Sequence, residues 1–313
     1  MTSARSLRGA AAIGLAAALS AGCVKASATE QAMALSRQHQ EERAIDVLRR
    51  RLAERPDDLP ARRLLVRLLG VTGDLGAARR EVDELERRVP EGDPVPWIEL
   101  GHAYELAHRF EDALAAYDDA ANVAKASPLG PREGGMRCAR WGEVDEARPR
   151  LEEAVRRGAR DAELWHALGL VRLHQRDLAA AEEAYRAGIA QDPDGVENVL
   201  GLATVAVVRG DAAGALAAYG AILARRPRYA PAEVGRAWAY GKLGRAEDAL
   251  RALDRAERLG AAPASLARAR ALLRAAPPAS RPSPPPPTSA PPESPSVSPV
   301  TAPPASPPPD APP

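Results

Sequence analysis

Small residues recur along this chain at intervals of 34 or 35 residues. Seven alanines mark the pattern most clearly: Ala44, Ala78, Ala113, Ala147, Ala181, Ala215 and Ala249. Four residues after each comes a larger apolar or aromatic residue, and these are Leu48, Val82, Tyr117, Leu151, Tyr185, Tyr219 and Leu253. Residues at i and i+4 share one face of a helix, and a small residue there lets a neighbouring helix approach closely. The pattern therefore predicts a series of similar packed helices.

Each period also contains a second helix, which comes before the alanine. Its own small position is occupied in turn by Ala32, Val66, Gly101, Gly135, Gly169, Ala203 and Ala237. Glycine-containing turns separate the two helices in four periods, at Gly73, Gly142, Gly210 and Gly244. Prolines close four periods, at Pro56, Pro90, Pro193 and Pro227, where they stop a helix. The unit predicted is helix–turn–helix.

Residues 94–127 carry the pattern in its most complete form. Trp97, Leu100, Gly101 and Tyr104 fall at the spacing W-x2-L-G-x2-Y, and Ala113 follows. This resembles the tetratricopeptide repeat, a helix–turn–helix unit about 34 residues long. The resemblance implies an all-α solenoid, coiled as a right-handed superhelix. It divides the array at residues 25–276 into seven repeats (25–58, 59–92, 94–127, 128–161, 162–195, 196–229 and 230–263) and a capping helix over 264–276.

The repeat at 128–161 departs from the pattern. Its first helix contains Gly130, Pro131, Gly134 and Gly135, and its second contains Pro149. Each glycine costs roughly 1 kcal/mol of helix propensity and an interior proline roughly 3 kcal/mol. Two interpretations follow: a shortened first helix that begins near Pro131, which we favour, or a hinge between repeats 25–127 and 162–263.

The first 22 residues are predicted to be a signal peptide. Arg5 and Arg8 precede a short apolar run over 9–19, which is too short to span a bilayer comfortably. The small residues before Cys23 resemble the lipobox of bacterial lipoproteins, which implies that Cys23 is lipidated. The alternative is an ordinary signal peptide, cut just before an incidental thiol. Cys138 is the only other cysteine, so no disulfide framework is expected, and we predict a small buried apolar residue there.

Residues 277–313 form a separate tail in which about half of the positions are proline. A segment of this composition has almost nothing to bury and favours extended conformations. We predict a disordered spacer. The alternative is a proline-rich ligand or an arm that penetrates the cell wall.

Charge and motif content exclude several classes of function. The formal charge is +1, and without leader and tail the basic and acidic residues are equal in number, so no nucleic-acid partner is expected. The sequence contains no H-E-x-x-H, no Walker A motif and no nucleophile elbow. We therefore predict a protein that is not an enzyme, with no cofactor, no metal and no small-molecule substrate.

The family resemblance also implies which residues face a partner-binding groove. Carried over residue by residue, they are Arg63, Arg67, His102, Glu105, Arg132, Arg140, Glu163, His166, His174, Thr204, Trp238 and Lys242. The first half of this set is rich in arginine, which predicts an acidic or carboxylate-bearing peptide as partner. The asparagine-and-lysine carboxylate clamp of chaperone-binding repeats is not reproduced, because neither Asn122 nor Asn198 falls on its positions.

The function predicted is that of a protein-interaction scaffold in the bacterial cell envelope. The layout resembles lipoproteins of this repeat class that help type IV pilus secretins assemble, and the outer membrane, facing the periplasm, is the expected location. One alternative is an adaptor for cell-wall enzymes, and another is a structural spacer that acts through the tail.

Overall fold

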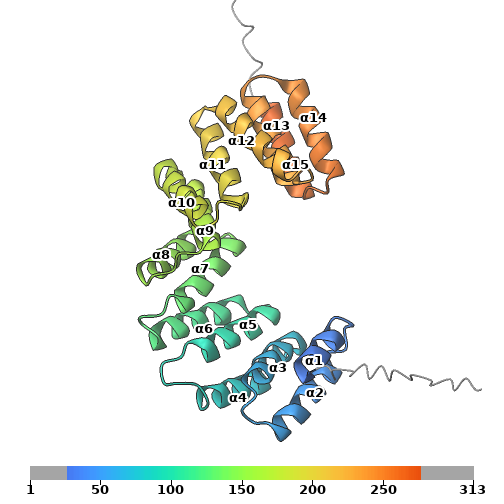
Figure 1. The fold of residues 1–313 in the computed structure, drawn as a ribbon, viewed down its shortest axis with the longest axis vertical. Helices are drawn as coiled ribbons and strands as arrows, with labels where there is room; N and C mark the ends of the chain where they lie inside the picture. Colours follow the sequence, from blue (N-terminus) through green and yellow to red (C-terminus); the bar gives the residue numbers. More distant parts are fainter. Residues whose placement is uncertain (1–26, 276–313) are drawn as a thin grey trace, which may run out of the picture. The chain divides into compact units, whose positions relative to one another are not determined.

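The computed structural model describes residues 27–275, and in that range the chain forms fifteen helices and no strand (Figure 1). The predicted signal peptide, Cys23 and the proline-rich tail lie outside the described residues. The helices are α1 Ala28–Ser36, α2 Glu41–Glu54, α3 Leu59–Thr72, α4 Leu75–Glu86, α5 Val95–Leu106, α6 Phe110–Val123, α7 Leu129–Trp141, α8 Val144–Arg156, α9 Ala162–His174, α10 Leu178–Gln191, α11 Glu197–Arg209, α12 Ala212–Arg225, α13 Ala230–Lys242, α14 Ala246–Arg258 and α15 Pro263–Ala275. Each of the first fourteen packs with its partner as a helix hairpin, and successive hairpins stack in chain order. The predicted all-α helical-repeat fold is confirmed.

The turn inside each hairpin needs one residue in the left-handed region of backbone space. The four predicted turn glycines adopt it, with φ of 78° at Gly73, 86° at Gly142, 99° at Gly210 and 70° at Gly244. In the other three hairpins the equivalent residue is not glycine: His39, His108 and Arg176 take φ of 56°, 58° and 63°. These three turns carry backbone strain that glycine would relieve.

Aspartates begin several of the helices that follow these turns. The side chain of Asp74 accepts a hydrogen bond from the Ala77 backbone N–H at 3.0 Å, and Asp211 does the same for Gly214 at 2.8 Å. Such a bond satisfies an N–H that the helix itself leaves unpaired, and is worth about 1 kcal/mol. These aspartates therefore help to determine the residues at which α4 and α12 begin.

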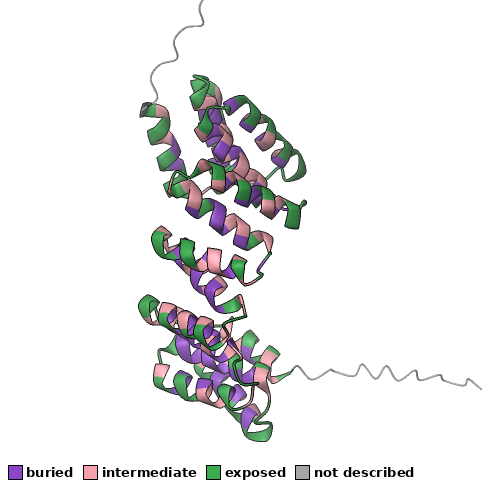
Figure 2. Ribbon diagram, turned by 90° about the vertical axis from the view of Figure 1, so that its left-hand side faces the viewer, coloured by how far each residue is buried: buried purple, intermediate pink, exposed green. Residues whose placement is uncertain are grey.

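Buried residues line the sides of the helices that pack together (Figure 2), and they follow the predicted register. All seven aligned alanines have no exposed surface, and the larger residues four positions later are also buried. Tyrosine and glycine face each other at the tightest places. A methyl group built on Gly169 would lie 2.5 Å from the Tyr185 ring, and one built on Gly101 would lie 2.4 Å from the Tyr117 ring. A large side chain on the second helix therefore requires its smallest possible partner on the first.

The repeat at 128–161 is regular: its first helix begins close to Pro131, as expected, but the expectation that this helix is shortened was wrong. Helix α7 begins at Leu129 and is as long as α9. Its glycines serve close packing: a methyl group on Gly130 would lie 2.4 Å from the backbone nitrogen of Ala121, and one on Gly135 would lie 2.8 Å from Leu151. Helix α8 continues through Pro149, which is exposed.

The last helix covers the end of the array. Leu266 and Ala269 on α15 are buried and pack with Leu253 and Ala256 of α14. Cys138 is fully buried as predicted, and burial raises the pKa of its thiol to about 11. None of the helices that the structure describes is both long and apolar enough to span a membrane.

Candidate binding face

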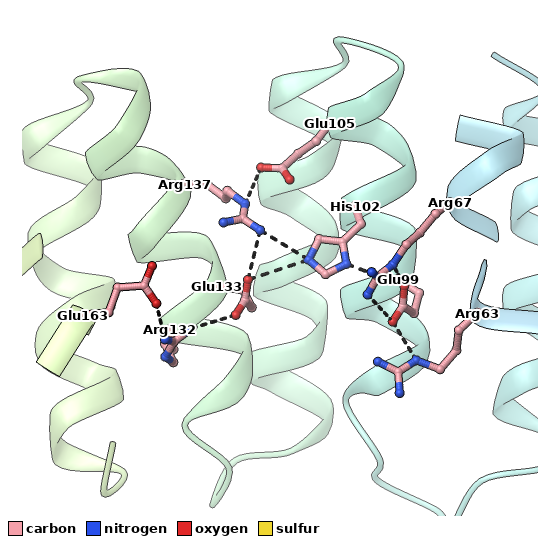
Figure 3. A network of polar contacts seen from close by, with 9 residues as sticks. All are labelled: Arg63, Arg67, Glu99, His102, Glu105, Arg132, Glu133, Arg137 and Glu163. Atoms are coloured by element: carbon pink, nitrogen blue, oxygen red, sulfur yellow. Dashed lines mark hydrogen bonds and ion pairs between the residues drawn. The ribbon is translucent and has the colours of Figure 1, made fainter. Parts of the chain in front are cut away.

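Four consecutive first helices, α3, α5, α7 and α9, present a continuous row of charged side chains (Figure 3). We call this row the polar network. Its members are Arg63, Arg67, Glu99, His102, Glu105, Arg132, Glu133, Arg137, Asp161 and Glu163. Some of its contacts lie within one helix, such as Arg132 with Glu133, and the others join different first helices. The row is continuous only because the repeats stack in register.

A fully buried carboxylate, Glu99, lies at one end of the network. Arg63 donates from Nε to Glu99 Oε1 at 2.7 Å. Arg67 donates from Nε to Oε2 at 2.5 Å and from Nη2 to Oε1 at 2.9 Å. Burial alone would raise the pKa of Glu99, but the hydrogen bonds and charges that face it lower the pKa to about 2. Glu99 is therefore ionised at any physiological pH and holds both guanidinium groups in place.

The imidazole of His102 lies between two carboxylates. Its Nδ1 is 3.6 Å from Glu99 Oε2 and its Nε2 is 3.7 Å from Glu133 Oε2. Both distances suit an ion pair of a protonated imidazole but are long for hydrogen bonds, so the arginines remain the principal partners of Glu99. Burial would lower the pKa of His102, and the two carboxylates more than offset it, so the pKa is raised.

Helix α7 connects the middle of the network to α5 and α9. Arg137 Nε lies 2.7 Å from Glu105 Oε1, and its Nη2 lies 3.3 Å from Glu133 Oε2. Arg132 donates to both oxygens of Asp161, at 3.0 and 2.9 Å, and to Glu163 at 3.1 Å. Long polar side chains thus bridge the successive first helices.

Six of the twelve predicted groove residues belong to the polar network: Arg63, Arg67, His102, Glu105, Arg132 and Glu163. Arg140, His174 and Lys242 are exposed, and no ion pair joins them to another described residue. The remaining three are half-buried. His166 packs on the Tyr185 ring at 5.8 Å, the Thr204 hydroxyl lies 3.2 Å from the Tyr219 hydroxyl, and Trp238 packs against the core of α11–α13.

The charge on this face differs from the sequence expectation. The arginines of the first half are not free cations, because each network arginine pairs with a carboxylate of the chain itself. Four guanidinium groups stand against five carboxylates, so the network carries −1 with His102 neutral and 0 with His102 protonated. A general preference for acidic peptides therefore does not follow from arginine content alone.

Four network residues were missed at the sequence level: Glu99, Glu133, Arg137 and Asp161. A signal for two of them was present. Glu99 and Glu133 stand at the same position of successive repeats, and Glu99 interrupts an apolar run between Ile98 and Leu100. A charge at a position that otherwise faces the core predicts a buried partner of opposite sign. The arginine partners of Glu99 lie more than 30 residues away, as does His102 for Glu133, and these pairings depend on how the repeats stack.

A cavity of about 590 Å³ lies elsewhere, at the junction of α8, α9 and α10. Trp165, Leu168 and Val155 supply its apolar part, and Arg172 and Glu152 pair across its polar part. Within residues 27–275, no group of three or more metal-binding side chains is placed to hold an ion. The polar network is the more extensive candidate for a binding surface.

Comparisons with known proteins agree with this architecture. A sequence model of the tetratricopeptide repeat family matches residues 140–196 and 200–265. No curated protein matches the chain.

Three solved structures illustrate the likeness in fold. The first, from the APC/C hetero-tetramer Cut9–Hcn1, is 16% identical with a TM-score of 0.55, and the match covers 79% of this chain and 48% of that one. A tetratricopeptide repeat protein from Parabacteroides merdae is 13% identical, with coverages of 79% and 97% and a TM-score of 0.52. The pilF protein of Pseudomonas aeruginosa is 16% identical, with coverages of 67% and 97% and a TM-score of 0.50. This chain therefore has the all-α tetratricopeptide repeat fold, and proteins with this fold generally serve as scaffolds that bind other proteins.

Proposed function

We propose that this protein is a non-enzymatic adaptor that binds a peptide or protein partner on the face formed by α3, α5, α7 and α9. The observation that carries the proposal is the polar network, centred on the fully buried carboxylate of Glu99. Buried ion pairs seldom stabilise a fold more than apolar residues of similar size would. A network that extends over four repeats is therefore better explained by recognition than by stability.

The network also suits recognition because it fixes long side chains before a partner arrives. Arg63 and Arg67 are each about half exposed, yet Glu99 holds them in one orientation. A free arginine on a surface would lose rotamer entropy on binding, at about 0.5–1.5 kcal/mol per side chain. Here much of that entropy is already lost on folding, so the face is preorganised.

The proposed location is the cell envelope. The leader and Cys23 support it by sequence alone, through the charged start, the short apolar run and the small residues before the cysteine. A lipidated Cys23 would anchor the N-terminus in a membrane leaflet, with the array facing the periplasm. In that setting the protein would assist assembly of an envelope complex, such as a type IV pilus secretin.

Site-specific photo-crosslinking in intact cells tests the proposal. A crosslinking amino acid would be placed on the face at Arg63 or Glu163, and away from it at Arg49 on α2. Adducts with an envelope protein from the face positions, but not from Arg49, are expected. A secretin adduct supports the assembly role, and a cell-wall enzyme adduct supports the alternative adaptor. A further crosslinking amino acid would be placed within residues 277–313, and adducts from that position alone would instead indicate a spacer.

Charge reversal supplies an independent test. Arg63→Glu with Arg67→Glu should abolish capture of the partner. Arg49→Glu with Arg50→Glu is the matched control, because it makes the same change of charge at two exposed α2 residues with no ion-pair partner among the described residues. The face variant removes both guanidinium partners of the buried Glu99, so thermal melts must show that it folds. Arg63→Gln, which leaves Arg67 on Glu99, should weaken capture and serves as the test if the double variant does not fold. Unchanged capture by the face variant would refute binding at this face.

A further inference from the structure

The polar network is unevenly charged along its length. His102 divides it into two parts. The part that we call the cationic end comprises Arg63, Arg67 and Glu99 and carries +1. The part that we call the acidic end comprises Arg132, Arg137, Glu105, Glu133, Asp161 and Glu163 and carries −2. Charge therefore changes sign from α3 towards α9.

The cationic end retains unused hydrogen-bond donors. Arg63 uses only Nε on Glu99, so both of its Nη groups have no partner among the described residues, and Arg67 likewise leaves Nη1 unused. The two arginine side chains are 45% and 42% exposed, whereas Glu99 is fully buried. Their free N–H groups are thus available to a carboxylate from outside, which Glu99 has already oriented them to receive (Figure 3).

The acidic end retains an unused acceptor. Glu163 is 66% exposed, and only its Oε2 has a partner, Arg132 Nη2. Asp161 is already occupied, because it accepts from Arg132 and also caps α9 through the Leu164 N–H. Arg140 lies two turns beyond Arg132 on α7, or about 12 Å away. The excess of negative charge therefore belongs to the N-terminal ends of α7 and α9.

We propose that the partner segment is extended and charge-polarised, with carboxylates over Arg63 and Arg67 and a lysine or arginine over Glu163. This rests on the proposed adaptor function and specifies its ligand. Three steps between adjacent first helices, each roughly 10 Å, separate the two ends by roughly 30 Å. An extended chain covers that distance in about nine residues. The segment can run in either direction, because only the positions of its charges are specified.

Binding of labelled nine-residue peptides to the full-length chain, followed by fluorescence anisotropy, tests this. The polarised probe carries two aspartates at one end and two lysines at the other, with a serine–glycine spacer. Its isomer has the same composition with each end carrying one aspartate and one lysine. The polarised probe should bind about tenfold more tightly, a difference of about 1.4 kcal/mol, and the preference should shrink as salt screens the charges. Equal affinities, or no binding of the polarised probe at millimolar concentration, would overturn the proposal.

Two single substitutions assign each end. Arg63→Gln should weaken a probe that carries only the aspartates and leave a lysine-only probe unchanged, and Glu163→Gln should do the reverse. Arg251→Gln and Glu247→Gln on α14 are the matched controls, because both side chains are exposed and far along the chain from the network. Both face side chains are substantially exposed, so the variants should fold, which melting curves can verify. If both face variants weaken both probes equally, the polarity is wrong.

The two proposals can fail separately. Crosslinks from Arg63 and Glu163 to a partner in cells, together with probes that bind without discrimination, would leave the adaptor function standing and refute the polarised segment. Absence of crosslinks, together with unselective probes, would refute both.

Discussion

Single residues in the hairpin turns decide how much strain each repeat carries. Seven equivalent positions exist, and Arg176 is among the three where a residue other than glycine takes positive φ. The left-handed conformation costs a residue with a Cβ about 1–2 kcal/mol, and glycine very little. The sequence analysis identified the four turns that contain glycine, whereas nothing in the sequence marked the positive φ of the other three.

Arg176→Gly should raise stability by about 0.5–1 kcal/mol, because relief of strain exceeds the added entropy of the unfolded chain. The side chain is exposed and forms no ion pair with a described residue, so little else is lost. Thermal unfolding would measure the change. Gly142 lies at the equivalent position of another hairpin, and a Cβ added there would meet no other atom within 4 Å. Gly142→Ala should therefore destabilise the array by a similar amount, through backbone strain alone. A lower melting temperature for Arg176→Gly would contradict this account.

Glu99, also considered as a single residue, should make the folding stability of the array depend on pH in the acidic range. Its pKa of about 2 in the folded state lies below the value of about 4.3 in an unfolded chain. Because the folded pKa is the lower one, ionised Glu99 contributes stability above pH 4.3, and that contribution is lost as pH falls towards 2. The difference amounts to on the order of 3 kcal/mol.

Glu99→Gln removes this charge at nearly constant shape. The variant should be less stable than the original chain near neutral pH, and the stability difference should close between about pH 4.3 and 2. Urea unfolding at several pH values would show it. Glu247→Gln, at an exposed position, should follow the pH dependence of the original chain. A difference that is independent of pH would mean that Glu99 acts by packing and not by charge.

At the scale of helices, small residues determine which helices pack together. This explains why the helices could be predicted from the sequence and the polar network could not. The alanines and glycines recur in register because each touches a neighbouring helix, so the helices and their pairing were predictable. The glycines of α7 obey the same rule. In the sequence analysis these glycines suggested a shortened helix or a hinge. Helix propensity measures only the entropy cost of glycine, and it does not include the close contact that Gly130 makes with the α6 backbone. The polar network escaped prediction for a related reason: its pairs join different repeats, and no local pattern specifies which side chains meet.

Two glycines in helices should respond to alanine in opposite ways. Gly169→Ala would place a methyl group 2.5 Å from the Tyr185 ring, so it should destabilise the array by about 1–3 kcal/mol. Gly220→Ala in α12 has no neighbour within 4 Å and should stabilise it by about 0.5–1 kcal/mol through helix propensity. Thermal unfolding of the two variants provides the comparison. In a Tyr185→Leu background the penalty of Gly169→Ala should fall, and a penalty that stays constant would show that the two residues are not coupled.

At the scale of the whole molecule, the question is whether α7 and α8 divide the array mechanically. In a repeat protein each hairpin is stabilised only by itself and its neighbours, so a weak repeat would let the two flanking parts move independently. The polar network bears on this directly, because Arg132 and Arg137 of α7 join α5 on one side to α9 on the other. A hinge there would separate the cationic end of the binding face from the acidic end.

The close contacts of α7 predict that no such hinge exists. Gly130 and Gly135 allow α7 to lie directly against α6 and α8, and Cys138 and Leu151 are fully buried between the helices. Native-state hydrogen exchange should therefore show amides of residues 129–150 protected as strongly as those of α5, α6 and α9. The internal comparison is α1, which has only nine residues and one fully buried side chain, and should exchange sooner. Rapid exchange confined to α7 and α8 would establish the hinge, and would make recognition of a partner across the whole face depend on closing it.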